Sequence, residues 1–267
     1  MSELVTVEVK DHVGFVTLNR PEKYNALSIE MFQKILEAGR AVMNEKTIRA
    51  IVLSGKGKGF CAGLDFENFQ KMLNKEVTVN LFERFHDTPA NMAQQAAYIW
   101  KQVPVPVIAA LHGVAYGGGL QLALGADIRL AAPDLKMSVM EIKWGLVPDM
   151  SITQTLCDLV RLDVAKELVF TGRTVDAQEA ARLGLVTRVC DDPMAEATAM
   201  AKLIASKSPD AISRDKQLLE GAWRSGPASG LILEETLQRE VIGGPNQIEA
   251  VMANFEKRDP KFEDRQS

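Results

Sequence analysis

The sequence holds few of the residues that build disulfides and metal centres. Among its 267 residues there are three cysteines and three histidines. Cys61, Cys157 and Cys190 lie far apart and form no CxxC pair, and the histidines show no ligand spacing. We therefore expect no structural disulfide and no metal site, and a reducing cytoplasm as the natural location.

An excess of positive charge and long apolar runs are also missing. Lysine and arginine number 31 against 35 acidic residues, a net charge of −4. This balance predicts neither a nucleic-acid partner nor attraction to an anionic membrane. No apolar run approaches the length of about 20 residues that spans a bilayer. The first residues, MSELVTVEVK, alternate as a strand rather than as a signal peptide, and the final DRQS is not a peroxisomal address. These features predict a soluble cytoplasmic protein.

The order of the expected elements divides the chain into two parts. Hydrophobic residues make up 46% and charged residues 25% of the sequence, as in ordinary globular proteins. Strands and helices alternate as far as about residue 192, and from there the pattern is nearly all helical. That last part is interrupted at Ser208-Pro209, Gly226-Pro227 and Gly244-Pro245. The sequence therefore predicts an α/β body, residues 1–192, and a helical C-terminal region, residues 193–267.

Periodicity places the individual elements. The expected strands are Leu4–Lys10, Val13–Leu18, Ala50–Ser54, Pro106–Leu111 and Leu185–Val189. Ser28 could cap a helix whose apolar face is Met31, Ile35, Ala38 and Val42. Further helices are expected at Ile152–Leu162, Val164–Phe170 and Ala177–Leu183. Residues 66–100 read as helical pieces with a break near Asp87-Thr88-Pro89. Their apolar side chains, beginning with Phe66, Phe69 and Met72, could wall a pocket or simply fill the core.

A strand that runs into a cluster of glycines is the most informative stretch. The strand 106–111 leads to the triplet Gly117-Gly118-Gly119 and a helix expected to begin at Leu120. Such glycines suggest that something approaches the backbone closely. The first amides of a helix lack acceptors and lie at its positive end, so they can hold a developing oxyanion. Glu141 and Asp149 follow as possible acid/base groups. These residues suit proton transfer beside a carbonyl; the alternative is a tight turn near two solvated acids.

A second glycine-rich exit follows the strand 50–54. Residues 57–62, GKGFCA, formally match the GxGxxA dinucleotide fingerprint. That fingerprint requires a helix at once, whereas here Asp65 leads into a long polar and aromatic stretch. A loop whose backbone approaches a ligand is the better interpretation.

Four segments together resemble the crotonase superfamily, that is, the enoyl-CoA hydratase/isomerase family. They are GFCAGLDF, AALHGVAYGGGLQLALGADIRLAA, MEIKWGLVPD and LVFTGRTVDAQEAARLGLV, in the family's order and spacing. The resemblance extends from LNRPEKYNALS to FEKRDPKF. It implies an α/β crotonase-like spiral of ββα turns with a C-terminal helical trimerisation region, and a homotrimer or a hexamer. It also implies an enzyme that acts on acyl-CoA thioesters, with coenzyme A as part of the substrate and no separate cofactor.

The resemblance further implies roles for individual residues. The backbone amides of Leu64 and Gly118 correspond to the family's oxyanion hole, which stabilises the enolate formed from a thioester. The family's coenzyme A contacts correspond to Arg20, Lys23, Ala26, Ala62, Leu64 and the C-terminal Lys257, the last sometimes reaching across a subunit boundary. Each basic residue taken alone is more often a solvated surface charge, and only the shared motif favours the ligand interpretation.

The acid/base positions discriminate between reactions of the family. Hydratases carry glutamates at the positions of Gln121 and Glu141, and a glutamine cannot usefully move a proton. In dienoyl-CoA isomerases a proton-moving pair matches Glu141 and Asp149, although those enzymes have an aspartate at the position of Gln121. The resemblance therefore favours an enoyl- or dienoyl-CoA isomerase, with Asp149 as base and Glu141 as acid.

Several alternatives stay open at this stage. The chain could be a 2-enoyl-CoA hydratase that uses Glu141, a low-turnover CoA-ester binding protein, or a thioesterase or decarboxylase on the same oxyanion platform. Asp149 could instead cap a helix that follows Met150-Ser151. Tyr116 could pack at the pocket rather than react.

Overall fold

A six-stranded sheet with a smaller sheet beside it forms the body of the protein. The computed structural model describes residues 3–65, 67, 70, 80–86 and 88–266. The large sheet has the order β1-β2-β3-β4-β6-β9 and is parallel except for the β1–β2 hairpin. Its strands are β1 (Val5–Lys10), β2 (Val13–Leu18), β3 (Ala50–Gly55), β4 (Val107–Leu111), β6 (Ile128–Ala131) and β9 (Arg188–Val189). The small sheet consists of β5 (Val114–Tyr116), β7 (Lys136–Ser138) and β8 (Val175–Asp176).

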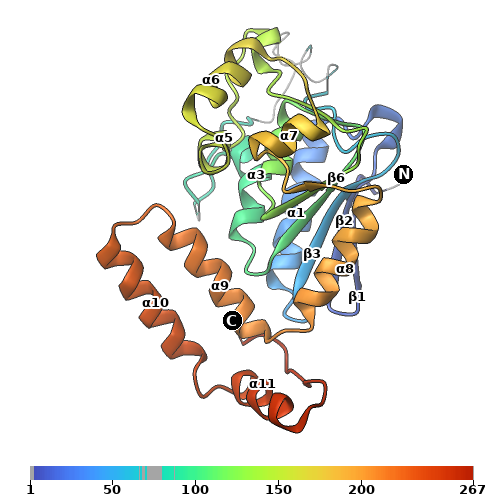
Figure 1. The fold of residues 1–267 in the computed structure, drawn as a ribbon. Helices are drawn as coiled ribbons and strands as arrows, with labels where there is room; N and C mark the ends of the chain where they lie inside the picture. Colours follow the sequence, from blue (N-terminus) through green and yellow to red (C-terminus); the bar gives the residue numbers. More distant parts are fainter. Residues whose placement is uncertain (1–2, 66, 68–69, 71–79, 87, 267) are drawn as a thin grey trace.

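Helices follow the strands and then continue alone to the C-terminus (Figure 1). In the body they are α1 (Ile29–Asn44), α3 (Met92–Gln102), α4 (Gly118–Leu124), α5 (Ile152–Thr155), α6 (Leu162–Thr171), α7 (Ala177–Leu183) and α8 (Pro193–Ala205). The remaining long helices are α9 (Pro209–Ala222), α10 (Pro227–Val241) and α11 (Pro245–Glu256). Three short 3-10 helices lie at η1 (Pro21–Lys23), η2 (Glu141–Trp144) and η3 (Leu156–Asp158). None of the helices within these described ranges is long and apolar enough to cross a membrane.

Sequence signals explain where several elements begin. The hydroxyl of Ser28 accepts a hydrogen bond from the backbone N–H of Met31 (3.1 Å), as predicted for the cap of α1. The predicted apolar face of α1 is buried. The three breaks predicted in the C-terminal region each place a proline in the first turn of a helix, where its missing N–H costs no hydrogen bond.

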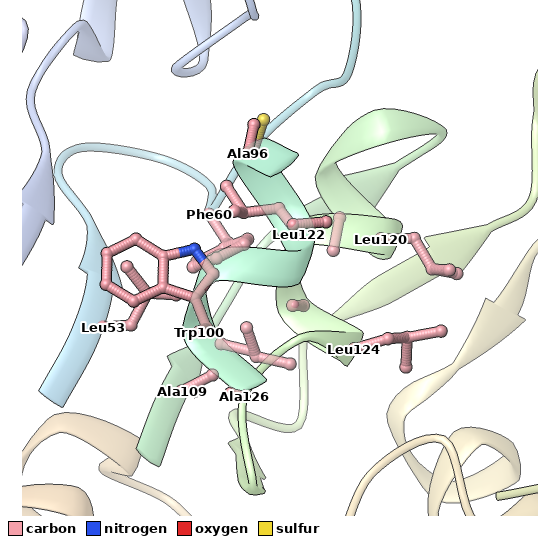
Figure 2. Close-up of a cluster of buried hydrophobic side chains, with 14 of the residues drawn as sticks. Leu53, Phe60, Ala96, Trp100, Ala109, Leu120, Leu122, Leu124 and Ala126 are labelled. Carbon is pink, nitrogen blue, oxygen red and sulfur yellow. The ribbon is translucent and has the colours of Figure 1, made fainter. Parts of the chain in front are cut away.

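The large sheet is covered on both faces. On one side a core cluster includes Trp100 of α3, which Figure 2 shows among Leu53, Phe60 and Ala109. On the other side α8 lays its small residues Ala197, Ala201 and Ala205 against buried side chains of β2, β3, β4 and β6. Both faces of the parallel strands are therefore dry, which is why these strands read as continuous apolar runs.

The helices α9, α10 and α11 form an arm that extends from the body (Figure 1). A buried ion pair anchors α9, since the ammonium of Lys216 contacts Asp127 (2.8 Å) and also donates to two backbone oxygens of the body, on Trp100 and Val105. The domain division predicted after residue 192 stays a prediction. The structure shows that α8, which follows that boundary, packs on the sheet of the body.

Three expected elements differ in the structure. The strand expected over Leu185–Val189 spans only Arg188–Val189. The helix expected over Ile152–Leu162 is wrong, because α5 ends at Thr155 and gives way to η3 and a turn before α6. Four β-branched residues in that stretch, Ile152, Thr153, Thr155 and Val160, have weak helix propensity, and the continuing apolar spacing concealed the break. The helix α4 begins at Gly118 rather than Leu120. The predictions for Phe66, Phe69 and Met72 lie outside the described residues.

Candidate active site

The glycine-rich exit that follows β3 and carries Leu64 is held against the loop before α1. Leu27 and Leu64 form a parallel bridge, in which the N–H of Leu27 donates to Gly63 O (2.7 Å) and the N–H of Asp65 donates to Leu27 O (3.1 Å). In a parallel ladder one residue bonds to both neighbours of its partner, so the partner's own N–H points the other way. The Leu64 amide is therefore directed away from Leu27.

The glycine-rich exit that carries Gly117 and Gly118 supplies another amide beside that of Leu64. Gly117, with φ of 51°, precedes α4, and Gly118 is the first residue of that helix. Its N–H therefore has no acceptor within the helix. A methyl group added to Gly63 would lie 3.5 Å from the Gly118 nitrogen, which shows how closely the two exits approach. A methyl group on Gly119 would lie 2.2 Å from the carbonyl oxygen of Cys61, so only glycine fits there.

A cavity of about 150 Å³ opens where the two exits meet. Among the described residues its lining consists of Ala62, Gly63, Leu64, Gly117, Gly118, Met140, Glu141, Trp144 and Leu146. The structure thus brings together three of the predicted site positions, namely Leu64, Gly118 and Glu141. Ala62, predicted as a coenzyme A contact, lines the same cavity.

Glu141 begins η2 and is held by the side chain of Gln121. The Nε2 atom of Gln121 donates to Oε1 of Glu141 (2.6 Å), and the Oε1 atom of Gln121 accepts from the backbone N–H of Met150 (2.8 Å). The Oε2 atom of Glu141 is buried and has no hydrogen-bond partner among the described residues. Burial raises the pKa of Glu141, the hydrogen bond from Gln121 opposes that rise, and the charge of Asp149 adds to it. A carboxyl group whose pKa is raised keeps its proton to a higher pH than a solvated one, which suits an acid/base role.

Asp149 lies close enough to affect Glu141 but does not line the cavity described above. Its residue surface is exposed, yet the protein atoms around the carboxylate raise its pKa by desolvation. The alternative in which Asp149 caps the following helix is wrong. Ser151, with φ of 59°, is the residue that precedes α5, and no side chain caps that helix.

Tyr116, on β5, is half-buried and is not among the cavity-lining residues of the described chain.

The predicted coenzyme A residues fall into two groups. The guanidinium of Arg20 pairs with Asp65 and donates to Ala26 O (3.1 Å), so it ties the first loop to the exit that carries Leu64. Lys23 pairs with Glu67 (2.8 Å) at the surface, while Ala26 itself is buried. These residues lie around the glycine-rich exit that carries Leu64.

Lys257 belongs to the second group. It follows the last residue of α11, in left-handed conformation with φ of 53°, at the end of the arm. Its proposed contact with coenzyme A stays a prediction, as do the contacts of the first group.

Sequence reasoning missed part of the site. Gln121 entered only as a departure from a pattern, although it holds Glu141 in place. Met140, Trp144 and Leu146 were not singled out as cavity walls. The segment MEIKWGLV gave a signal for the walls, since its apolar residues flank Glu141 between two turns. No local signal could have paired Gln121 with Glu141, because they are 20 residues apart.

Solved structures share this architecture over nearly the whole chain. An enoyl-CoA hydratase from Bacillus anthracis superposes with a TM-score of 0.86 at 30% identity, over 97% of this chain and 98% of that one. A putative enoyl-CoA hydratase from Streptomyces coelicolor gives 0.89 at 33% identity, over 98% and 94%. The fold is therefore the α/β crotonase fold, and the protein is an enzyme of the crotonase superfamily, as the sequence predicted.

Sequence comparison identifies the family within that class. The family model of enoyl-CoA hydratase/isomerase matches residues 8–265, and the chain belongs to this family. It is 35% identical to a probable enoyl-CoA hydratase of Mycobacterium bovis, over 98% of this chain and 99% of the relative. It is also 32% identical to a mitochondrial methylglutaconyl-CoA hydratase of Mus musculus, over 95% and 81%.

Proposed function

We propose that this enzyme shifts a double bond in an enoyl- or dienoyl-CoA thioester by proton transfer. The observation that carries the proposal is that Glu141 shares one cavity with Leu64 and Gly118. In this proposal the two backbone amides bind the thioester oxygen. A carboxylate then removes a proton from the acyl chain, and the negative charge moves onto that oxygen. Donors aimed at such an oxyanion lower the barrier by about 3–4 kcal/mol each.

Gln121 is what favours isomerisation over hydration. Addition of water by a pair of carboxyl groups needs an acid and a base, whereas an amide at position 121 supplies neither. A double-bond shift only relocates a proton from one carbon to another. Asp149 is the proposed second group, and its raised pKa and electrostatic influence on Glu141 support it. Asp149 is assigned as base and Glu141 as acid by family resemblance.

Hydration of a 2-enoyl-CoA is the second candidate. Relatives named as enoyl-CoA hydratase and methylglutaconyl-CoA hydratase favour it. In that case Glu141 would activate the water, with Asp149 as an unusual partner. A weakly active CoA-ester binding protein is a third possibility, disfavoured by the buried carboxyl group in the cavity.

The proposal extends to assembly and location. Large apolar side chains are exposed along the arm, including Leu231, Ile232, Ile248 and Phe255, and they support a homotrimer or hexamer built through it. The three cysteines are free, which supports the cytoplasm as the working compartment. Arg20, Lys23, Ala26, Ala62, Leu64 and Lys257 remain the proposed coenzyme A contacts.

Incubation in D₂O with a 3,5-dienoyl-CoA or a 2-enoyl-CoA, followed by absorbance and mass spectrometry, tests the proposal. The Glu141→Gln and Asp149→Asn variants run beside an Asp163→Asn control, whose side chain is exposed on α6. Conversion of the dienoyl ester to its 2,4 isomer, lost in both site variants and kept in the control, supports an isomerase. Rapid water addition to the 2-enoyl ester, with Asp149 dispensable, establishes the hydratase instead.

A further inference from the structure

Gln121 lies at the junction of three segments of the site. It is fully buried on α4, in the helical turn that follows Gly118. Its amide group reaches Glu141 of η2 on one side and the backbone of Met150 on the other. One side chain therefore connects the helix of the proposed oxyanion donor, the proposed proton-transfer group and the residue after Asp149.

The orientation of the Gln121 amide is fixed by chemistry. A backbone N–H can only donate, so the atom that faces the Met150 nitrogen must be the carbonyl oxygen of Gln121. Its NH₂ group must then face Glu141, where it donates to Oε1. A flipped amide would set two donors against each other at Met150. The side chain thus delivers a donor, and never an acceptor, to the carboxyl group.

This donor leaves the two oxygens of Glu141 in different states. Oε1 is engaged by Gln121 at 2.6 Å, whereas Oε2 is buried with no partner among the described residues. A buried oxygen without a partner is unfavourable unless it carries a proton or meets one from a ligand.

We infer that Gln121 is a positioning residue that holds the carboxyl group of Glu141 through Oε1 in the orientation from which it exchanges a proton with the acyl chain. This inference rests on the proposed function. Because the amide of Gln121 cannot titrate, Glu141 does not share a proton with the side chain at position 121. A glutamate at position 121 would instead set two carboxyl groups within hydrogen-bond distance, and one of them would have to stay protonated.

The inference has a signature in pH dependence. Burial raises the pKa of Glu141, a backbone hydrogen bond and the bond donated by Gln121 lower it, and the charge of Asp149 raises it. Loss of the donor removes the opposing effect, so the pKa of Glu141 must rise further. One neutral hydrogen bond corresponds to a shift of about one pH unit.

The test uses two substitutions of Gln121 with different geometry. Gln121→Met keeps the length of the side chain but loses both hydrogen bonds. Gln121→Glu keeps an acceptor for Met150 and replaces the amide donor by a second carboxyl group that can titrate. The matched control is Gln95→Met on α3, since Gln95 is also buried and hydrogen-bonded through both ends of its amide but lies outside the cavity lining.

Two readouts are compared, the pH profile of kcat/KM and the titration of Glu141 followed by ¹³C NMR in glutamate-labelled full-length protein. Because Glu141 is the acid in the proposed function, we expect the basic limb of the kcat/KM profile and the titration of Glu141 to move up by about one pH unit in Gln121→Met. In Gln121→Glu the two carboxyl groups should titrate as a coupled pair whose higher apparent pKa lies above the wild-type value. Gln95→Met should keep the wild-type profile even if its melting temperature falls.

The outcomes separate this inference from the proposed function. If Glu141→Gln is inactive while both Gln121 variants keep the wild-type pH profile and titration, the positioning role is wrong and the proposed function stands. If Glu141→Gln keeps full activity, the proposed function itself fails. A fall in activity of the Gln121 variants without any shift in either readout also overturns the positioning role.

Discussion

The body and the arm are both helical where they meet, but they differ in the exposure of their apolar side chains. In α8 the alanines at positions 197, 201 and 205 are buried against the sheet. In α10 only Leu237 is buried, whereas Leu231 and Ile232 are 63% and 65% exposed. The small residues of α8 are thus buried within one chain, although Leu203 on the same helix is exposed, whereas the apolar pair Leu231 and Ile232 of the arm stays exposed. Chemistry should therefore respond to changes in the body, and assembly to changes in the arm.

The largest difference between the regions should come from adding one methyl group to a glycine. In Gly119→Ala, next to the donor of Gly118, the new carbon would lie 2.2 Å from the backbone carbonyl oxygen of Cys61, so the backbone that carries the proposed donors must move. We expect kcat to fall about 10²–10³-fold, the usual loss for a displaced oxyanion donor. Gly226→Ala in the arm meets nothing within 4 Å and should leave steady-state kinetics unchanged. Equal kinetics for both variants would contradict the oxyanion assignment.

The second-largest effect should come from removing the ion pair that connects α9 to the body. Lys216→Met leaves Asp127 and two backbone oxygens without their buried cation. Because the Asp127 side chain is 20% exposed, breaking this largely buried pair should lower the free energy of unfolding by about 2–3 kcal/mol, less than for a fully buried pair and measurable by urea denaturation. The comparison is Lys202→Met, whose pair with Asp11 is exposed and should contribute less than about 1 kcal/mol. A similar loss in both variants would show that burial does not distinguish the two ion pairs.

The arm itself can be tested by charge. A Leu231→Glu, Ile232→Glu double variant changes only exposed side chains, so the monomer should keep its fold within about 1 kcal/mol. If the arm builds the oligomer, sedimentation should show a shift to monomers. Glu235→Gln, which alters an exposed ion pair on the same helix, should keep the wild-type mass. An unchanged mass in the double variant would remove this face of α10 from the interface.

The smallest expected effect concerns the loss of folding stability that comes from burying the ionised carboxylate of Glu141. A carboxyl group whose pKa is raised on folding favours the folded state while it is protonated, below its ordinary value of 4.5. That contribution is lost as the pH rises through the raised pKa. Glu141→Gln should therefore gain melting temperature relative to wild type between pH 5 and pH 8, roughly the range above that value. A gain that is equal at both ends of the range would show that the pKa is not raised.

Much of the fold could be predicted because its signals are local. The cap at Ser28, the face of α1 and the prolines that begin α9, α10 and α11 are each written within a few residues. The break inside Ile152–Leu162 was missed, because apolar spacing continues through it while the backbone turns. The amides of Leu64 and Gly118 left only glycines as a trace, and the family resemblance was needed to assign them.

The bonds of Gln121 could not be predicted. They join residues 20 and 29 positions apart and depend on how η2 and Met150 fold back over α4. There was also no signal in the sequence that Asp149 lies outside the cavity lining. Its spacing of eight residues from Glu141 does not determine the direction in which the intervening turn folds.

The oxyanion donors of this site would be main-chain atoms, and that has a consequence for how such an enzyme can change. A substitution can remove a side chain but not a backbone N–H, so mutation leaves the stabilising element in place unless it moves the loop. Positions such as 121 and 149 can then vary one at a time while the intermediate keeps its support. A new reaction can therefore evolve by side-chain substitution while the stabilisation of the oxyanion is retained.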